Sequence, residues 1–85
     1  MNIAGYRFVD LNDRDELQAM LRSLCLDLGL KGTVLLAPEG INFFLAGISS
    51  SIDAFTQALE NDERFTDIPL KVYYTNYQPF NRMNV

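Results

Sequence analysis

Apolar and polar residues alternate near the start of the chain, as they do in a β-strand with one buried face. Over residues 4–11 this alternation separates Tyr6 and Phe8 from Arg7. Further along, the apolar residues recur every three or four positions instead, which predicts a helix. The apolar stripe of this helix is Leu17, Met20, Leu21, Leu24 and Leu28.

Polar residues and glycine mark where the helices begin and end. Asn12 or Asp13 can cap the first helix, because short polar side chains accept hydrogen bonds from the free amides of a first turn. Gly29 stands where a left-handed residue commonly ends a helix. A second helix is expected, with Ser50 or Ser51 as its cap. Its apolar residues are Ile52, Phe55 and Leu59, and it fades near Asn61.

Between the two helices, the runs 33–37 and 41–46 are short, apolar and partly β-branched. They flank Pro38, Glu39 and Gly40. Proline presets the φ angle of a turn and glycine accepts positive φ, so the sequence predicts two antiparallel strands joined tightly.

A last alternating run, 70–75, completes the order βαββαβ before Pro79 ends regular structure. This order predicts one α+β domain over residues 1–85, of the ferredoxin-like type that acylphosphatases share. We expect a four-stranded antiparallel sheet with both helices on one face, because crossovers are right-handed. The other face of the sheet is then open to water or to a partner.

Composition narrows the classes of function. Eleven acidic residues against seven basic ones give a net charge of −4, which disfavours unaided nucleic-acid binding. The chain has no histidine and one cysteine, so neither the usual metal sites nor a histidine triad is expected, and no cofactor is predicted. No stretch approaches the ~20 apolar residues that cross a membrane. A single cysteine favours a reducing compartment, and we expect the cytoplasm.

Two features bear on whether the chain has chemistry of its own. Cys25 accompanies the apolar stripe of the first helix, so we expect it to pack rather than react. Acylphosphatases hold phosphate in a glycine-rich loop between the first strand and the first helix. The corresponding loop here, 10–13, contains two carboxylates and no glycine, which disfavours acylphosphatase activity.

RNA-recognition modules also have the order βαββαβ, and they stack bases on aromatic residues of their central strands. Tyr6, Phe8 and either Phe43 or Phe44 can imitate this arrangement. The basic sequence motif of such modules is absent, and one of the two phenylalanines is expected in the core. Independent RNA binding is therefore disfavoured.

Polar side chains gather around the expected hairpin. Lys31 precedes its first strand, and Glu39 and Asn42 lie at or just after the turn. Solvated turn residues that bond local backbone explain this pattern as well as a binding site does, and the first explanation is preferred.

The hairpin and the end of the chain together resemble a known family. The relevant residues are Lys31 to Asn42, Ala46 and Gly47 around the hairpin, and Gln78 to Met83 at the end. This pattern is similar to that of the rhodanese-related tRNA uridine hydroxylase family. The resemblance extends over nearly the whole chain.

The resemblance implies a two-part parent protein. Its first part is an acylphosphatase-like domain, and its second is a rhodanese domain that carries the catalytic cysteine. Members form 5-hydroxyuridine at the wobble position of tRNA in an oxygen-dependent reaction. Cys25 matches the first domain and not the rhodanese loop, so we expect these 85 residues to be an accessory part of a longer chain.

The resemblance leads to two predicted partners, the downstream rhodanese domain and, through the parent enzyme, tRNA. No membrane partner is expected. A purely structural or protein-interaction module is the first alternative, and an acylphosphatase-like hydrolase is the second. The residues that we expect to contact tRNA or the other domain are Lys31, Glu39, Asn42, Lys71, Tyr77 and Arg82.

Overall fold

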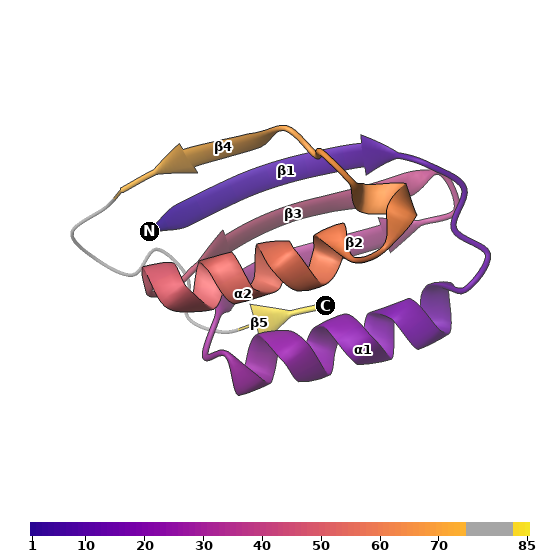
Figure 1. Ribbon diagram of the computed structural model, residues 1–85. Helices are drawn as coiled ribbons and strands as arrows, with labels where there is room; N and C mark the ends of the chain where they lie inside the picture. Colours follow the sequence, from indigo (N-terminus) through magenta and orange to yellow (C-terminus); the bar gives the residue numbers. More distant parts are fainter. Residues whose placement is uncertain (75–82) are drawn as a thin grey trace.

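A computed structural model describes residues 1–74 and 83–85 of the chain, and Figure 1 shows a single sheet with two helices packed on one side of it. The strands are β1 (Asn2–Phe8), β2 (Lys31–Ala37), β3 (Gly40–Ala46), β4 (Leu70–Tyr73) and β5 (Met83–Asn84). The helices are α1 (Arg14–Asp27), α2 (Ser49–Glu60) and the short 3-10 helix η1 (Glu63–Phe65). Neither α1 nor α2 has the length and hydropathy of a membrane-spanning helix.

The strands lie in the order β4-β1-β3-β2-β5, which confirms the ferredoxin-like arrangement and the open face opposite the helices. The first four strands pair antiparallel, as predicted. The prediction of only four strands was wrong, because β5 pairs parallel to β2 through Gly32 and Met83. A two-residue strand has no periodic pattern of its own, and only its tertiary pairing reveals it.

The core fills the space between the sheet and the two helices. Phe43 of β3 meets Phe55 of α2 edge to face, with ring centroids 5.5 Å apart. On α1 the fully buried residues are Leu17, Leu21 and Cys25, which confirms the packing role of the cysteine. Met20 is 47% exposed, so its assignment to the stripe was wrong. The buried stripe consists of Leu17, Leu21 and Cys25, and the predicted Leu24 and Leu28 pack against the core as partly buried residues.

The predicted capping side chains do not cap. Asp13 occupies the N-cap position of α1, but its carboxylate makes no capping hydrogen bond and pairs with Arg64 instead. Helix α2 begins at Ser49, so Ile48 is its N-cap and Ser51 is buried within the first turn. For Asp13, a tertiary ion pair thus takes the place of the local capping hydrogen bond.

The hairpin between β2 and β3 is tight, because Ala37 pairs with Gly40 and only two residues connect them. Its turn carbonyls also hold the segment that follows β1. The amide of Val9 donates to the carbonyl oxygen of Glu39 at 2.9 Å, and that of Leu11 donates to Pro38 at 3.0 Å. Strand β1 therefore ends at Phe8, earlier than the predicted residue 11.

Candidate functional site

Alternate residues of the strands point away from the helices, and the sheet register arranges them in rows across the open face. Two rows lie near the hairpin: Phe8, Gly40 and Ala37, then Tyr6, Asn42 and Leu35. The third row consists of Lys71, Ala4, Phe44 and Thr33. The fourth, which is largely buried, consists of Tyr73, Asn2, Ala46 and Lys31.

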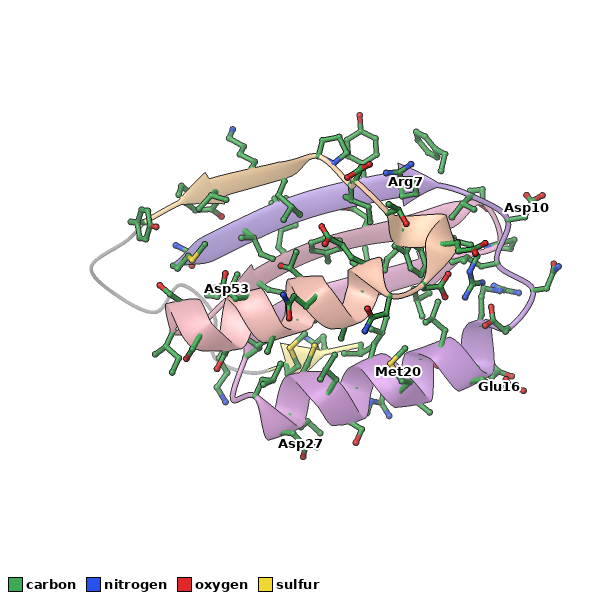
Figure 2. The ribbon with its side chains drawn as sticks, in the orientation of Figure 1. Arg7, Asp10, Glu16, Met20, Asp27 and Asp53 are labelled. Carbon is green, nitrogen blue, oxygen red and sulfur yellow. The ribbon has the colours of Figure 1, made fainter. Side chains whose placement is uncertain are left out.

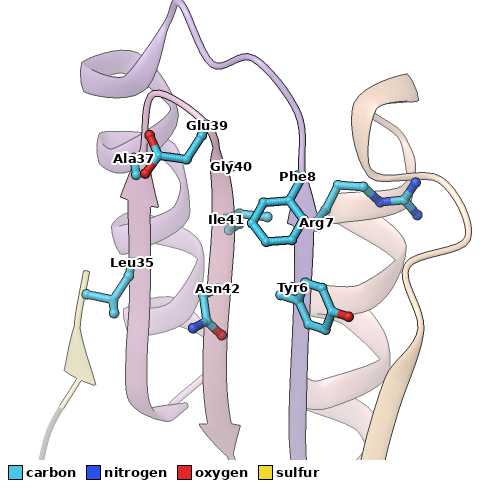
Figure 3. A pocket seen from close by; sticks show the side chains of 9 residues that line it. All are labelled: Tyr6, Arg7, Phe8, Leu35, Ala37, Glu39, Gly40, Ile41 and Asn42. Carbon is cyan, nitrogen blue, oxygen red and sulfur yellow. The ribbon is translucent and has the colours of Figure 1, made fainter.

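A first hollow of about 310 Å³ lies over the two rows nearest the hairpin (Figure 3). Tyr6 and Phe8 of β1 form one wall, and Leu35 of β2 stands on the other side. The floor lies over Gly40 and Asn42 of the strand between them. The hollow exists because the first row has a glycine at its centre and an alanine at its side.

A second hollow, of about 360 Å³, adjoins the first and shares Tyr6 and Asn42 with it. Ala4 forms its floor, with Phe44 on one side and Lys71 on the other. The small side chain of Ala4 explains the depression. Tyr6 and Asn42 therefore stand between two neighbouring hollows, each of which has an aromatic wall.

The aromatic side chains of this face are well exposed: Phe8 is 79% exposed, Tyr6 61% and Phe44 46%. Tyr6 and Phe8 meet edge to face, with centroids 5.7 Å apart and planes at 65°. That geometry does not stack one ring on the other, so ring faces stay available. Leu35, at 61% exposed, adds apolar surface.

Among the described residues, acidic side chains are absent from the strands, whereas basic side chains occur both on the strands and on the helices. Across the five described strands there is no Asp or Glu, and the charged strand residues are Arg7, Lys31 and Lys71. Arg7 is directed away from the rings and donates to the carbonyl oxygen of Thr66 at 2.7 Å (Figure 3). Acidic residues lie on the helices and connecting loops, as Asp10, Glu16, Asp27 and Asp53 illustrate in Figure 2.

Four of the six predicted contact residues fall in the described part of the chain. Asn42 and Lys71 are exposed on the open face, and Glu39 stands in the turn at its hairpin end. Lys31 shares the face, but it is half-buried in the fourth row. Tyr77 and Arg82 lie outside the described residues.

The prediction missed the contribution of Leu35 and set aside Tyr6, Phe8 and Phe44. A signal for the rings was present, since Tyr6 and Phe8 are two apart on one strand and so share a face. Phe44 joins them only through the register that pairs it with Ala4. Adjacent strands from distant parts of the sequence assemble the site.

The loop before α1 is held by an ion-pair cluster rather than open to a phosphate. Arg64 Nη1 lies 2.6 Å from Asp13 Oδ1, and Arg64 Nη2 lies 2.6 Å from Asp62 Oδ2. Hydrogen bonds from this guanidinium lower the pKa of Asp13 and of Asp62 below the ordinary value near 3.8. The same bonds raise the pKa of Arg64. These groups fasten η1 to the start of α1.

The remaining group with covalent chemistry, Cys25, faces the core. Burial raises the pKa of its thiol to about 11, so the thiolate is scarce at neutral pH. In residues 1–74 and 83–85, no group of three His, Cys, Asp or Glu side chains is placed to hold a metal ion. The exposed groups of the open face are suited to binding by stacking, hydrogen bonding and charge.

Comparison with known proteins identifies the family. The model of the UPF0176 acylphosphatase-like domain matches residues 1–85. The chain belongs to this family. Two curated relatives, both named tRNA uridine(34) hydroxylase, come from Thiobacillus denitrificans and Cupriavidus pinatubonensis. They are 53% and 55% identical to it over the whole chain.

The chain spans 34% and 30% of the length of those two relatives. Among solved structures, an acylphosphatase from Bacillus subtilis has a TM-score of 0.74 and 15% identity, and the match covers 100% of this chain and 98% of that one. At that identity the likeness shows the fold alone. The chain thus has an acylphosphatase-like fold, and its own loop between β1 and α1, residues 10–13, contains two carboxylates.

Proposed function

We propose that this chain is the N-terminal, non-catalytic substrate-binding domain of a tRNA uridine(34) hydroxylase. In this proposal the parent enzyme is a cytoplasmic oxidoreductase that forms 5-hydroxyuridine at the wobble position with oxygen. The chemistry takes place in a rhodanese domain that follows in the parent chain. Support comes from identities of 53% and 55%, taken over the whole chain, to two proteins named tRNA uridine(34) hydroxylase that are about three times its length.

The open face is the observation that supports a binding role. It places Asn42 and Lys71 beside exposed aromatic rings, and the acidic residue that lines a hollow, Glu39, stands in the turn at the hairpin end rather than on a strand. Such groups hold a nucleic acid without reacting with it. The net charge of −4 is not spread evenly, so it does not describe this surface.

A protein-interaction module that only stabilises the catalytic domain is the alternative with support of its own. The exposed apolar side chains Leu35 and Phe44 favour it, because apolar patches commonly mark protein contacts. An acylphosphatase-like hydrolase has less support, since Asp13 and Asp62 engage the guanidinium of Arg64 beside the loop where that activity would need a free cation.

Charge reversal in the full-length parent enzyme separates these functions. Lys71→Glu is expected to weaken tRNA binding by about tenfold, because a charge-assisted contact is replaced by repulsion. Hydroxylation at subsaturating tRNA should fall in parallel, with the melting temperature unchanged. Arg14→Glu makes the same charge change at an exposed position on α1 and serves as the matched control.

Two results, taken together, would contradict the proposal. If Lys71→Glu and Arg14→Glu leave tRNA affinity the same, and removal of residues 1–85 does not reduce hydroxylation by a parent that remains folded, the domain does not bind substrate. A fall in melting temperature with unchanged tRNA affinity would instead support the protein-interaction module.

A further inference from the structure

We propose that the two hollows of the open face bind unpaired RNA bases, one on each side of Tyr6 and Asn42. This inference rests on the proposed function and specifies which part of an RNA the domain holds. It assigns a base-binding site to six residues: Tyr6, Phe8, Leu35, Asn42, Phe44 and Lys71.

The shape and lining of the hollows suit planar bases. At about 310 and 360 Å³ they lie at the low end of the range for small-ligand sites, so each fits one ring system rather than a large ligand. Each has an exposed ring in its wall, Phe8 in the first and Phe44 in the second, and Tyr6 borders both. Aromatic side chains stack on any base because every base has a π face.

A hydrogen-bonding group stands where a base edge would lie. Asn42 is exposed at the centre of the face, and its side chain lies between the β1 rings and Leu35 (Figure 3). An amide offers a donor and an acceptor together, and it pairs with the edges of bases.

The expected binding energies favour a single strand of RNA over an RNA duplex. Stacking contributes roughly 1–3 kcal/mol per base, and the face offers three rings for it. A duplex hides its bases and presents phosphates, so affinity for it depends on many cations. Among the described residues of this face, the cations are Lys71 and the half-buried Lys31, and Glu39 adds a carboxylate at the hairpin end of the first hollow. Two phosphate contacts cannot hold a duplex at physiological salt.

The test uses the 85-residue chain and a fluorescein-labelled RNA of about ten nucleotides, unstructured and free of self-complementarity, long enough to span the site of one small domain. The same strand annealed to its complement is the second probe. Fluorescence anisotropy should show single-strand binding at least about tenfold tighter than duplex binding. The plot of log K against log salt for the single strand should be no steeper than about −1.4, because two lysines contribute about 0.7 each.

Variants of the chain test where on its surface the RNA binds. Tyr6→Ala and Phe44→Ala are each expected to weaken single-strand binding by about tenfold, as loss of one stacked base requires. Phe44→Tyr keeps a ring and should retain affinity, which shows that the position tolerates change. Leu26→Ala removes an exposed apolar side chain from α1, at 61% exposure, and should have no effect.

Three results would overturn this inference: equal affinity for single strand and duplex, ring variants that behave like Leu26→Ala, or no binding of either RNA. Self-association that disappears in Phe44→Ala would also overturn it by showing a protein interface. The parent enzyme's response to Lys71→Glu is measured separately on tRNA, so the base-binding inference can fail while the proposed function stands.

Discussion

At the scale of single residues, Gly40 and Ala4 shape the site, because glycine has no side chain and alanine has only a methyl group. Gly40 sits between Phe8 and Ala37, and a Cβ there would collide with the carbonyl oxygen of Arg7 on the neighbouring strand. Ala4 leaves the corresponding space beside Phe44. The hollows therefore depend on small residues at central strand positions, where larger side chains would fill them.

Replacement of Gly40 should destabilise the protein through this collision. Gly40→Ala is expected to cost about 3 kcal/mol, because backbone of β1 and β3 must separate to admit the methyl group. Gly29→Ala is the matched control: Gly29 has a φ of +68°, but nothing lies within 4 Å of its added Cβ. It should cost about 1 kcal/mol, from backbone conformation alone. Urea denaturation measures both, and equal losses would contradict the collision.

At the scale of elements, Arg64 joins segments that the sequence keeps far apart. Its guanidinium bonds Asp62 at the start of η1 and Asp13 at the start of α1, and it lies 5.3 Å from the ring centroid of buried Phe65. This contact fixes the loop that precedes α1 against the end of the second crossover.

The stability of the folded protein should therefore decrease at acid pH. The pKa values of Asp13 and Asp62 are lowered in the folded state, so the unfolded state binds more protons as pH falls. The stabilisation is complete above the ordinary pKa near 3.8 and is lost as pH falls through the lower folded values. Arg64→Met should lower the melting temperature at neutral pH, by an amount that shrinks toward about pH 2.5.

Arg14→Met removes the same charge from an exposed position outside this cluster. Its melting temperature should remain close to that of the unchanged protein over the same pH range. A melting difference for Arg64→Met that stays constant from neutral to acid pH would show that the carboxylates do not provide the stabilisation.

Elements with a strong repeating pattern were predictable from the sequence, and those set by tertiary contact were not. Buried Ile52, Phe55 and Leu59 follow the helical spacing of α2 directly. Strand β5, with two residues, has no pattern to read. The capping prediction for Asp13 failed because its partner is 51 residues away.

At the scale of the whole molecule, the two layers have different surfaces. The helices and loops carry the acidic residues, while the open face of the sheet presents rings, Asn42 and Lys71. The net charge is a sum over both layers. Composition alone therefore predicted weak RNA binding, because the sum includes the acidic residues of the helices and loops. Two residues of the proposed site, Asn42 and Lys71, were named from the sequence. The other four come together with them on one face only through the register of four strands.

The central claim is that the open face of the sheet holds the substrate RNA. A nitrogen-15 NMR titration of the 85-residue chain with tRNA tests it most directly, because every amide reports its own surroundings. The account predicts shifts concentrated at Tyr6, Phe8, Asn42, Phe44 and Lys71, with the exposed outer residues of α1 and α2 unchanged. Shifts confined to the helices, or a spectrum unaffected by tRNA, would contradict it.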